Sequence, residues 1–268
     1  MSIAGKFMSH LIEMGQGYAT TEEYHMRRAI FEETDAFIEL HNSSNASFML
    51  GHNKFSTMTK EEKAKTRGLL YTELLNVAEP VVLSTDNLPA SVDWREQNAV
   101  NDIQDQGQCG SCWAFSTMAA VEGAAAIKTG NLQKFAEQEL VDCSSLNHGC
   151  NGGSMALGFL YLKSHFAELE GSYPYTAADG TCAYDSASKS SVETTGLGTN
   201  VQQQSSSQLK AAVAKTVVSV AIEADKAVFQ LYKSGIFDSS SCGTTLDHGV
   251  ALVGYGSEGG QEYYILKN

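Results

Sequence analysis

Hydrophobic and polar positions follow two different periods along this chain. Residues from about 20 to 42 have the period of an amphipathic helix, and Thr20 and Glu23 have the spacing of a capping box at its start. Later helices and strands follow from the same patterns. Helices are predicted at 112–128, 138–143, 155–166 and 207–215, and strands at 217–222, 249–255 and 262–267. A helical half followed by a strand-rich half favours an α+β fold with two lobes.

One stripe of the first helix is more regular than amphipathicity requires. Its members lie within an arc of roughly 100°: Glu23, Arg27, Phe31, Thr34, Ile38 and Asn42. Such a mixed stripe predicts a face that packs against other residues, although an ordinary solvated face is the alternative. Residues 51–55 then read as a short strand, 58–62 as the start of a helix, and 76–88 as an extended linker.

Composition and charge exclude some classes of protein. The 268 residues, 43% of them hydrophobic, suit one large domain or a medium domain with an accessory segment. The net charge is −13, and no Lys/Arg cluster supplies the basic surface of a nucleic-acid-binding protein. No stretch reaches the roughly 18 apolar residues that span a bilayer. The first ten residues contain no apolar run of the kind that a signal peptide has.

The six cysteines all lie between Cys109 and Cys242, and an even number is typical of disulfides in an oxidising compartment. Cys109 and Cys112 also form a CxxC, which serves as a redox pair or as half of a zinc site in other proteins. A second closely spaced cluster is missing, and the flanking residues do not suit a thioredoxin-like domain. We therefore predict no metal site and no cofactor.

Cys112 is the candidate nucleophile because it stands at the first turn of a predicted helix, where the helix dipole favours a thiolate. Three histidines follow it, and His148 and His165 have no catalytic context. His248 begins an apolar strand, which would hold a base rigidly. Asn268 follows the next strand and offers an amide that can orient the imidazole. Asp247 is open to two interpretations, a structural residue or a third acid.

Residues 106–116, with the sequence QGQCGSCWAFS, closely resemble the nucleophile segment of the papain family of cysteine peptidases. Other segments share the resemblance: 89–95, 137–143, 149–153, 173–175 and 263–268. The stripe at 23–42 and residues 51–55 resemble two pro-region motifs of cathepsin L-like zymogens. Two positions differ, since Thr34 stands where the first motif has Asn and Thr57 where the second has Asp. We expect the missing carboxylate at position 57 to change the pH at which the pro-region is released.

The resemblance implies a two-lobed papain-like fold at 88–268, preceded by a mainly helical inhibitory pro-region at 1–87. It implies that Cys112 is the nucleophile and that His248 is the imidazolium that later acts as a general base. Asn268 would orient His248, and the side chain of Gln106 would donate to the oxyanion hole together with the backbone N–H of Cys112.

The same resemblance implies the substrate-binding residues. The S2 pocket would be lined by Met155, Ala221, Leu246 and Gly249, whose apolar character predicts an apolar P2 residue. The backbones of Gly152 and Gly153 would bind the extended substrate. Disulfides are implied between Cys109 and Cys150 and between Cys143 and Cys182. Cys242 would stay unpaired, because its family partner lies beyond Asn268.

The expected protein is a cysteine endopeptidase zymogen whose own pro-region blocks the cleft until acid weakens it. Its expected partners are polypeptide substrates and cystatin-like inhibitors, in a monomer that is lysosomal, vacuolar or secreted. Sequons at Asn42 and Asn45 leave glycosylation open. Since the family continues past the position of Asn268, we expect an incomplete copy of a longer precursor. The alternatives are a truncated inactive relative and a pro-region-type inhibitor of related peptidases.

Overall fold

Two helices dominate the N-terminal part of the computed structural model, which describes residues 1–70, 79–188 and 198–268. Helix α1 (Ile3–Met14) begins where the Ser2 side chain accepts the N–H of Gly5, and it ends at Gly15 in the left-handed conformation. Helix α2 (Thr21–Asn42) begins where Thr20 accepts the N–H of Glu23. The helix predicted at 20–42 is thus confirmed as α2, whereas α1 was not predicted.

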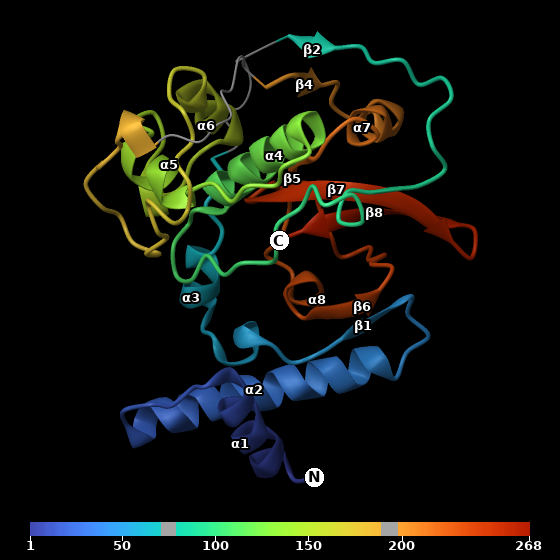
Figure 1. Ribbon diagram of the computed structural model, residues 1–268. Helices are drawn as coiled ribbons and strands as arrows, with labels where there is room; N and C mark the ends of the chain where they lie inside the picture. Colours follow the sequence, from blue (N-terminus) through green and yellow to red (C-terminus); the bar gives the residue numbers. More distant parts are fainter. Residues whose placement is uncertain (71–78, 189–197) are drawn as a thin grey trace. The chain divides into compact units, whose positions relative to one another are not determined.

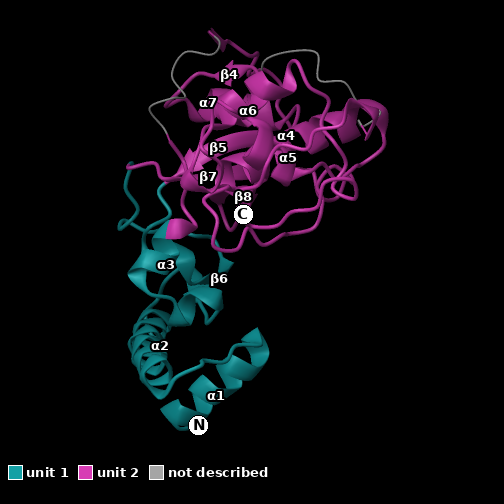
Figure 2. Cartoon of the chain, turned by 90° about the vertical axis from the view of Figure 1, so that its left-hand side faces the viewer, with its two compact units in different colours: residues 1–64, 223–244 teal, residues 65–222, 245–268 magenta. Residues whose placement is uncertain are grey.

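The described residues form two compact units (Figure 2). The first unit contains residues 1–64 together with 223–244, and the second contains residues 65–222 together with 245–268. A stretch from the C-terminal half therefore folds with the N-terminal helices.

The first unit also holds a small antiparallel sheet and short helical elements. Strand β1 (Phe48–Leu50) pairs with β6 (Tyr232–Gly235). The strand predicted at 51–55 is wrong: the Asn53 side chain accepts the N–H of Phe55 and starts the 3₁₀ turn η1 (Lys54–Thr57). Two short helices complete the unit, α3 (Lys60–Lys65) and α8 (Ala227–Gln230). Helix α3 ends at the boundary between the two units, which follows Ala64.

The stripe on α2 packs as predicted, which rules out a solvated face for its apolar members. Phe31 is fully buried in a cluster with Phe7 and Leu11, and Ile38 is buried in a second cluster with Phe48. At the end of the stripe, Asn42 binds both the N–H and the carbonyl of Leu50 at 2.9 Å. This bidentate contact attaches β1 to the helix.

The second unit contains the longer helices of the C-terminal region. They are α4 (Cys112–Thr129), α5 (Glu137–Cys143), α6 (Met155–Leu162) and α7 (Ser206–Val213), with 3₁₀ turns η3 (Gly149–Asn151) and η4 (Ser186–Ser188). Helix α6 is shorter than predicted, because the Tyr161 carbonyl accepts the N–H of Ser164 and contacts the His165 ring, which tightens the last turn.

Strand β7 (His248–Glu258) is the centre of the main sheet. It pairs antiparallel with β3 (Val92–Asp93) and β5 (Val218–Ile222), and with β8 (Gln261–Lys267) through a hairpin. A separate parallel pair joins β2 (Pro80–Val81) to β4 (Asn200–Val201). The predicted linker at 76–88 lies outside the described residues over 76–78.

Helix α4 is the buried centre of this second unit (Figure 1). It contacts β7 and β5 on one side and α5 and α6 on the other. Small side chains on α4 let the sheet approach closely. The Ser116 hydroxyl donates to the Val250 carbonyl at 2.8 Å, and the Ser116 carbonyl accepts from the Ser219 hydroxyl. The starts of α4 and β7, where Cys112 and His248 lie, are therefore held by a shared core.

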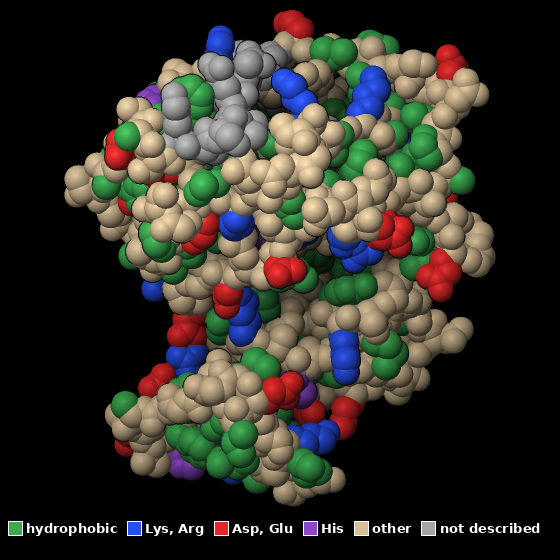
Figure 3. Space-filling view, in the orientation of Figure 1, with side chains coloured by type: hydrophobic (Ala, Val, Ile, Leu, Met, Phe, Trp, Pro, Cys, Tyr) green, Lys and Arg blue, Asp and Glu red, His purple; other side chains and the backbone are tan. Residues whose placement is uncertain are grey.

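Charged side chains of both signs are interspersed over the face shown in Figure 3. Among the described residues, no helix has the length and apolar character needed to cross a bilayer.

A buried ion cluster beside α4 gives a test of this core. Lys134 binds Glu122 at 3.1 Å and Glu137 at 2.5 Å, and both carboxylates are only 2% exposed. Burial raises the pKa of Glu137 to about 7. We expect Lys134→Met to lower the free energy of unfolding by about 3–5 kcal/mol at pH 8, because two buried carboxylates lose their counterion.

Urea denaturation of the full chain at pH 8 and pH 5 measures this effect. The loss should shrink at pH 5, where Glu137 binds a proton in the folded state. The exposed Lys128→Met is the matched control and should leave the midpoint unchanged. Equal losses for both variants would contradict the assignment.

Candidate active site

Cys112 is the first residue of α4 and is 1% exposed. The loop before it turns at Gly107, whose φ is +62°, and it is attached to the neighbouring loop by the Cys109–Cys150 disulfide. The N–H of Gly110 also donates to the Cys150 carbonyl at 2.9 Å. The thiol is thus fixed at the positive end of the helix dipole, where a thiolate is favoured.

His248 begins β7 and is 4% exposed. Its Nε2 lies 2.7 Å from Oδ1 of Asn268, the residue that follows β8. Because an amide oxygen only accepts, Nε2 carries the hydrogen and Nδ1 is the nitrogen that can act on the thiol. The hairpin of β7 and β8 therefore sets the orientation of the imidazole.

The two groups shift each other's protonation. Burial, the largest effect on Cys112, raises the pKa of its thiol, but the neighbouring imidazole of His248 and the N–H groups of Gly249 and Gly68 outweigh it and lower the pKa. Burial likewise lowers the pKa of His248, but Cys112, Asn268 and the charge of Asp247 together raise it. The arrangement favours a thiolate beside an imidazolium.

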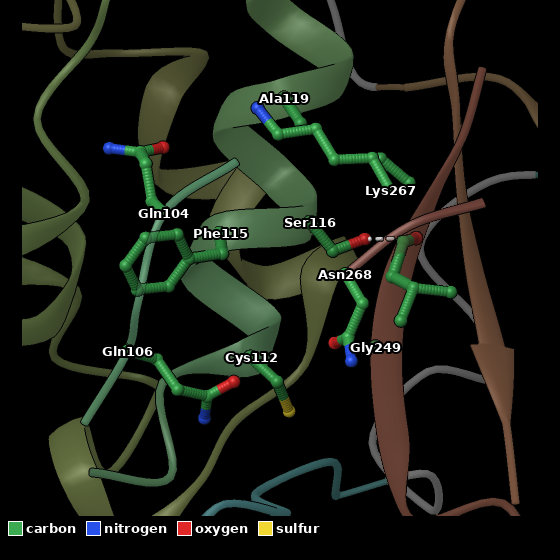
Figure 4. Close-up of a pocket in the computed structure, with 11 residues that line it drawn as sticks. Gln104, Gln106, Cys112, Phe115, Ser116, Ala119, Gly249, Lys267 and Asn268 are labelled. Atoms are coloured by element: carbon green, nitrogen blue, oxygen red, sulfur yellow. Dashed lines mark hydrogen bonds between the residues drawn. The ribbon is translucent and has the colours of Figure 1, made fainter. Parts of the chain in front are cut away.

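Gln106 lies on the loop before α4, and its side chain lies near those of Cys112 and Asn268 (Figure 4). Its Nε2 donates to the Cys109 carbonyl at 2.8 Å and to the Thr66 carbonyl at 2.9 Å. Its own backbone carbonyl accepts from the Tyr175 hydroxyl at 2.8 Å. These contacts aim an amide N–H donor at a carbonyl oxygen beside the thiol.

Residues 66–70, which we call the blocking segment, lie directly over the thiol. The N–H of Gly68 donates to Sγ of Cys112 at 3.4 Å. The Gly68 carbonyl accepts from Gly153 at 2.8 Å, and the N–H of Leu70 donates to the Gly153 carbonyl at 2.9 Å, in a parallel pairing. The sulfur of Cys112 therefore faces the N–H of Gly68.

The residues predicted to line the S2 pocket share one apolar cluster. Leu69, 7% exposed, and Met155 belong to it, and Ala221 and Leu246 pack against it. A Cβ on Gly249 would lie 2.9 Å from the Met155 sulfur, so the glycine makes room for that side chain. Gly152 has a φ of +115°, and a Cβ there would meet the Gly68 carbonyl. The blocking segment thus occupies the surface formed by these residues.

The remaining candidates have other partners. The Asp247 carboxylate pairs with Arg67 at 2.8 Å, whereas the ring of His248 has Asn268 as its partner. His165 stacks on Tyr161, and the backbone N–H of His148 donates to the Gly152 carbonyl. A second disulfide joins Cys143 to Cys182, and Cys242 is a free, half-buried thiol in the first unit. Within the described ranges, no three His, Cys, Asp or Glu side chains gather as a metal site.

Sequence reasoning did not find the blocking segment. Its only signal is a glycine between Arg67 and two leucines directly after a short charged helix, a pattern too common to interpret. The acceptor role of Thr66 and the contact of Gly68 with the sulfur depend on residues far away in the sequence.

Comparison with known families identifies the chain. Residues 88–268 match the model described as papain family cysteine protease, and residues 7–62 match the cathepsin propeptide inhibitor domain. The chain belongs to the papain family of cysteine proteases. The papain family relatives include the probable cysteine protease RD21B of Arabidopsis thaliana, 46% identical over 259 residues, and caricain of Carica papaya, 40% identical over 266 residues.

The extent of these matches differs. The alignment with RD21B covers 92% of this chain but 54% of RD21B, so the chain spans about half the length of that relative. The alignment with caricain covers 98% of this chain and 76% of caricain.

Solved structures of papain family precursors superpose closely. Digestive procathepsin L 3 of the Tenebrio molitor larval midgut has a TM-score of 0.91 and 37% identity, covering 100% of this chain and 89% of its own. The recombinant stem bromelain precursor has a TM-score of 0.91 and 35% identity, covering 99% and 87%. The predicted papain-like α+β fold is therefore confirmed.

A substitution at Gly68 tests the blocking segment. A Cβ at this position would collide with the backbone of Gly110. We expect Gly68→Ala to lift the segment and to speed alkylation of Cys112 in the intact chain at neutral pH by roughly tenfold or more, since overpacking costs on the order of 1–3 kcal/mol.

The alkylation rate is measured by mass spectrometry after timed exposure to an epoxide. Gly171→Ala is the matched control, because a Cβ there meets open space. An unchanged rate in Gly68→Ala would mean that the segment does not limit access to the thiol.

Proposed function

We propose that this chain is the zymogen of a cysteine endopeptidase, with an inhibitory pro-region at 1–87 and a peptidase domain at 88–268. The observation that carries the proposal is the buried pair of Cys112 and His248, whose ring is held by Asn268 at 2.7 Å. A structural thiol or histidine would not need opposite pKa shifts and an orienting amide. The membership of the papain family supports the same reaction.

In the proposed reaction, the thiolate of Cys112 attacks the scissile carbonyl carbon. The oxyanion that forms accepts hydrogen bonds from Nε2 of Gln106 and from the backbone N–H of Cys112. The imidazolium of His248 gives its proton to the leaving amine as the C–N bond breaks, which leaves a thioester. Water then attacks the thioester with His248 as the base, and the acid product and the thiolate are released. Asn268 keeps the ring aligned throughout.

The pro-region acts in this proposal by using the substrate's own contacts. The Thr66 carbonyl accepts the hydrogen bond of the Gln106 side chain. The backbones of Gly68 and Leu70 form hydrogen bonds with the backbone of Gly153. Leu69 lies in the apolar cluster of Met155, which supports a preference for apolar P2 side chains such as Leu or Phe. A P2 Arg would lose its hydration there without gaining a counterion.

Release of the pro-region in acid is supported by a histidine buried in the first unit. His10 is 3% exposed, and among the described residues neither of its ring nitrogens has a hydrogen-bond partner. Its ring lies 5.1 Å from that of Phe31 and 5.6 Å from that of His52. Burial lowers the pKa of His10 from 6.5, the charge of His52 lowers it further, and Glu13 on the same helix opposes this.

The groups around these rings fix the direction of the effect. His52 binds the Asp35 carboxylate at 3.1 Å and the Ser56 hydroxyl at 3.0 Å, and Asp35 also binds Lys6. Within the described part of the chain, the ring nitrogens of His10 bind no carboxylate in this way. Because its folded pKa is lowered, the unfolded unit binds more protons below pH 6.5, so the stability of the unit falls as the pH falls through this range.

Further features of the proposed enzyme follow from its class. We expect polypeptide substrates, inhibition by cystatin-like proteins, a monomer, and a lysosomal, vacuolar or secreted location. The prediction that Thr57 changes the pH of release also stays open. The rival proposal, a non-enzymatic inhibitor, predicts no hydrolysis by the chain itself.

Thiol chemistry tests the proposed function. After incubation at acidic pH, we expect the chain to hydrolyse a peptide with Leu at P2 and to lose that activity with one equivalent of an alkylating epoxide, bound at Cys112. Burial and the nearby Glu223 raise the pKa of the other free thiol, Cys242, so it should react far more slowly.

Cys112→Ala should abolish hydrolysis. The matched Cys242→Ala should still hydrolyse the peptide and should still lose that activity with one equivalent of the epoxide. A chain that inhibits a related peptidase but never hydrolyses peptide would instead favour the inhibitor.

His10→Gln tests the acid trigger, because glutamine stays neutral at every pH. We expect the pH midpoint of pro-region release, followed by gel mobility, to fall in this variant, since no buried charge forms. The exposed His25→Gln is the control and should keep the parent midpoint. A parent-like midpoint in His10→Gln would place the trigger elsewhere.

A further inference from the structure

Residues of the blocking segment lie where we expect the residues of a bound peptide substrate to lie. Leu69 lies in the apolar cluster that includes Met155, the predicted S2 surface, and the N–H of the preceding residue, Gly68, faces the Cys112 sulfur. Arg67 is the next residue of the segment, on the opposite side of Gly68 from Leu69. In a cleaved peptide, that side belongs to the leaving group, whose first residue is P1′.

Arg67 makes a specific contact at this position. Its Nε lies 2.8 Å from Oδ2 of Asp247, with side-chain exposures of 18% for the arginine and 28% for the aspartate. The backbone of Asp247 is held on both sides, because its N–H donates to Ile222 and its carbonyl accepts from Leu69 at 3.2 Å. These bonds fix the backbone of Asp247 directly before His248, and its carboxylate contacts Arg67 of the blocking segment.

We propose that the Asp247 carboxylate selects a positively charged residue, Arg or Lys, at the P1′ position of the peptide. This inference rests on the proposed peptidase function and adds a specificity to it. When the blocking segment leaves, the half-buried carboxylate loses its ion pair with Arg67. A cationic P1′ side chain replaces that charge, whereas an acidic one meets repulsion in a region of lowered dielectric.

The preference arises on the leaving-group side, so it is independent of the S2 pocket. Asp247 directly precedes His248, and its charge already contributes to the raised pKa of that imidazole. Replacing Asp247 will therefore change the absolute rate as well. The informative quantity is the ratio of kcat/KM between two peptides measured with the same enzyme, because any loss of catalytic power cancels in that ratio.

The test uses blocked peptides with Leu at P2 and Gly at P1, differing only in Arg, Lys, Gln or Glu at P1′. With the chain activated at acidic pH, we expect kcat/KM for Arg and Lys to exceed that for Gln by about fivefold, and Glu to be the poorest. The Arg/Gln ratio should fall in high salt, which screens a partly exposed pair.

Asp247→Asn should bring the Arg/Gln ratio to about one while the preference for Leu over Arg at P2 persists. Asp93→Asn is the matched control, because that aspartate lies on β3 and pairs with Arg95, and it should keep the parent ratio.

Each result is decisive. Equal cleavage of all four peptides by the parent chain overturns the inference and leaves the peptidase function in place. A parent preference that survives in Asp247→Asn also overturns it, because another group then reads the P1′ charge. If no peptide is cleaved under any condition, the proposed function fails, and the inference fails with it.

Discussion

Cys112 is 1% exposed and His248 is 4% exposed. Each group shifts the pKa of the other against the effect of burial, downward for the thiol and upward for the imidazole. Desolvation alone would neutralise both groups, so the charged pair exists only while the two side chains stay next to each other. The fold determines this placement. It requires α4 and β7 to begin side by side, the β7–β8 hairpin to deliver Asn268, and Gly249 to leave room for Met155.

The blocking segment stabilises the same charge that makes the site reactive. The N–H of Gly68 contributes to the lowered pKa of the thiol, so the proposed inhibition does not depend on protonating the sulfur. The segment instead presents a hydrogen-bond donor where a substrate presents an electrophilic carbon, and its Thr66 carbonyl occupies the Gln106 amide. In the proposed zymogen, the site is therefore assembled while the segment covers it, and removal of the segment requires no rearrangement of Cys112, His248 or Asn268.

The elements that the sequence predicted well are those whose pattern is local. Helix α4 and strand β7 carry long apolar runs and clear ends, such as the left-handed Gly130 after α4, and the stripe on α2 repeats over five turns. Strand β1 was misplaced because it has only three residues, and its partner β6 lies almost two hundred residues away. The pairing of Arg67 with Asp247 was equally hidden, since two opposite charges far apart in sequence carry no periodic signal.

The sheet of β1 and β6 joins a strand from the matched propeptide region to one from the matched protease region. While the chain is continuous, the two strands are tethered, and each meets the other at a high effective concentration. A cut in the backbone between them converts this pairing into a bimolecular one, whose strength depends on dilution. The short strands then offer only seven residues of ladder between them. Dilution then favours separation after such a cut, because two independent chains gain translational freedom.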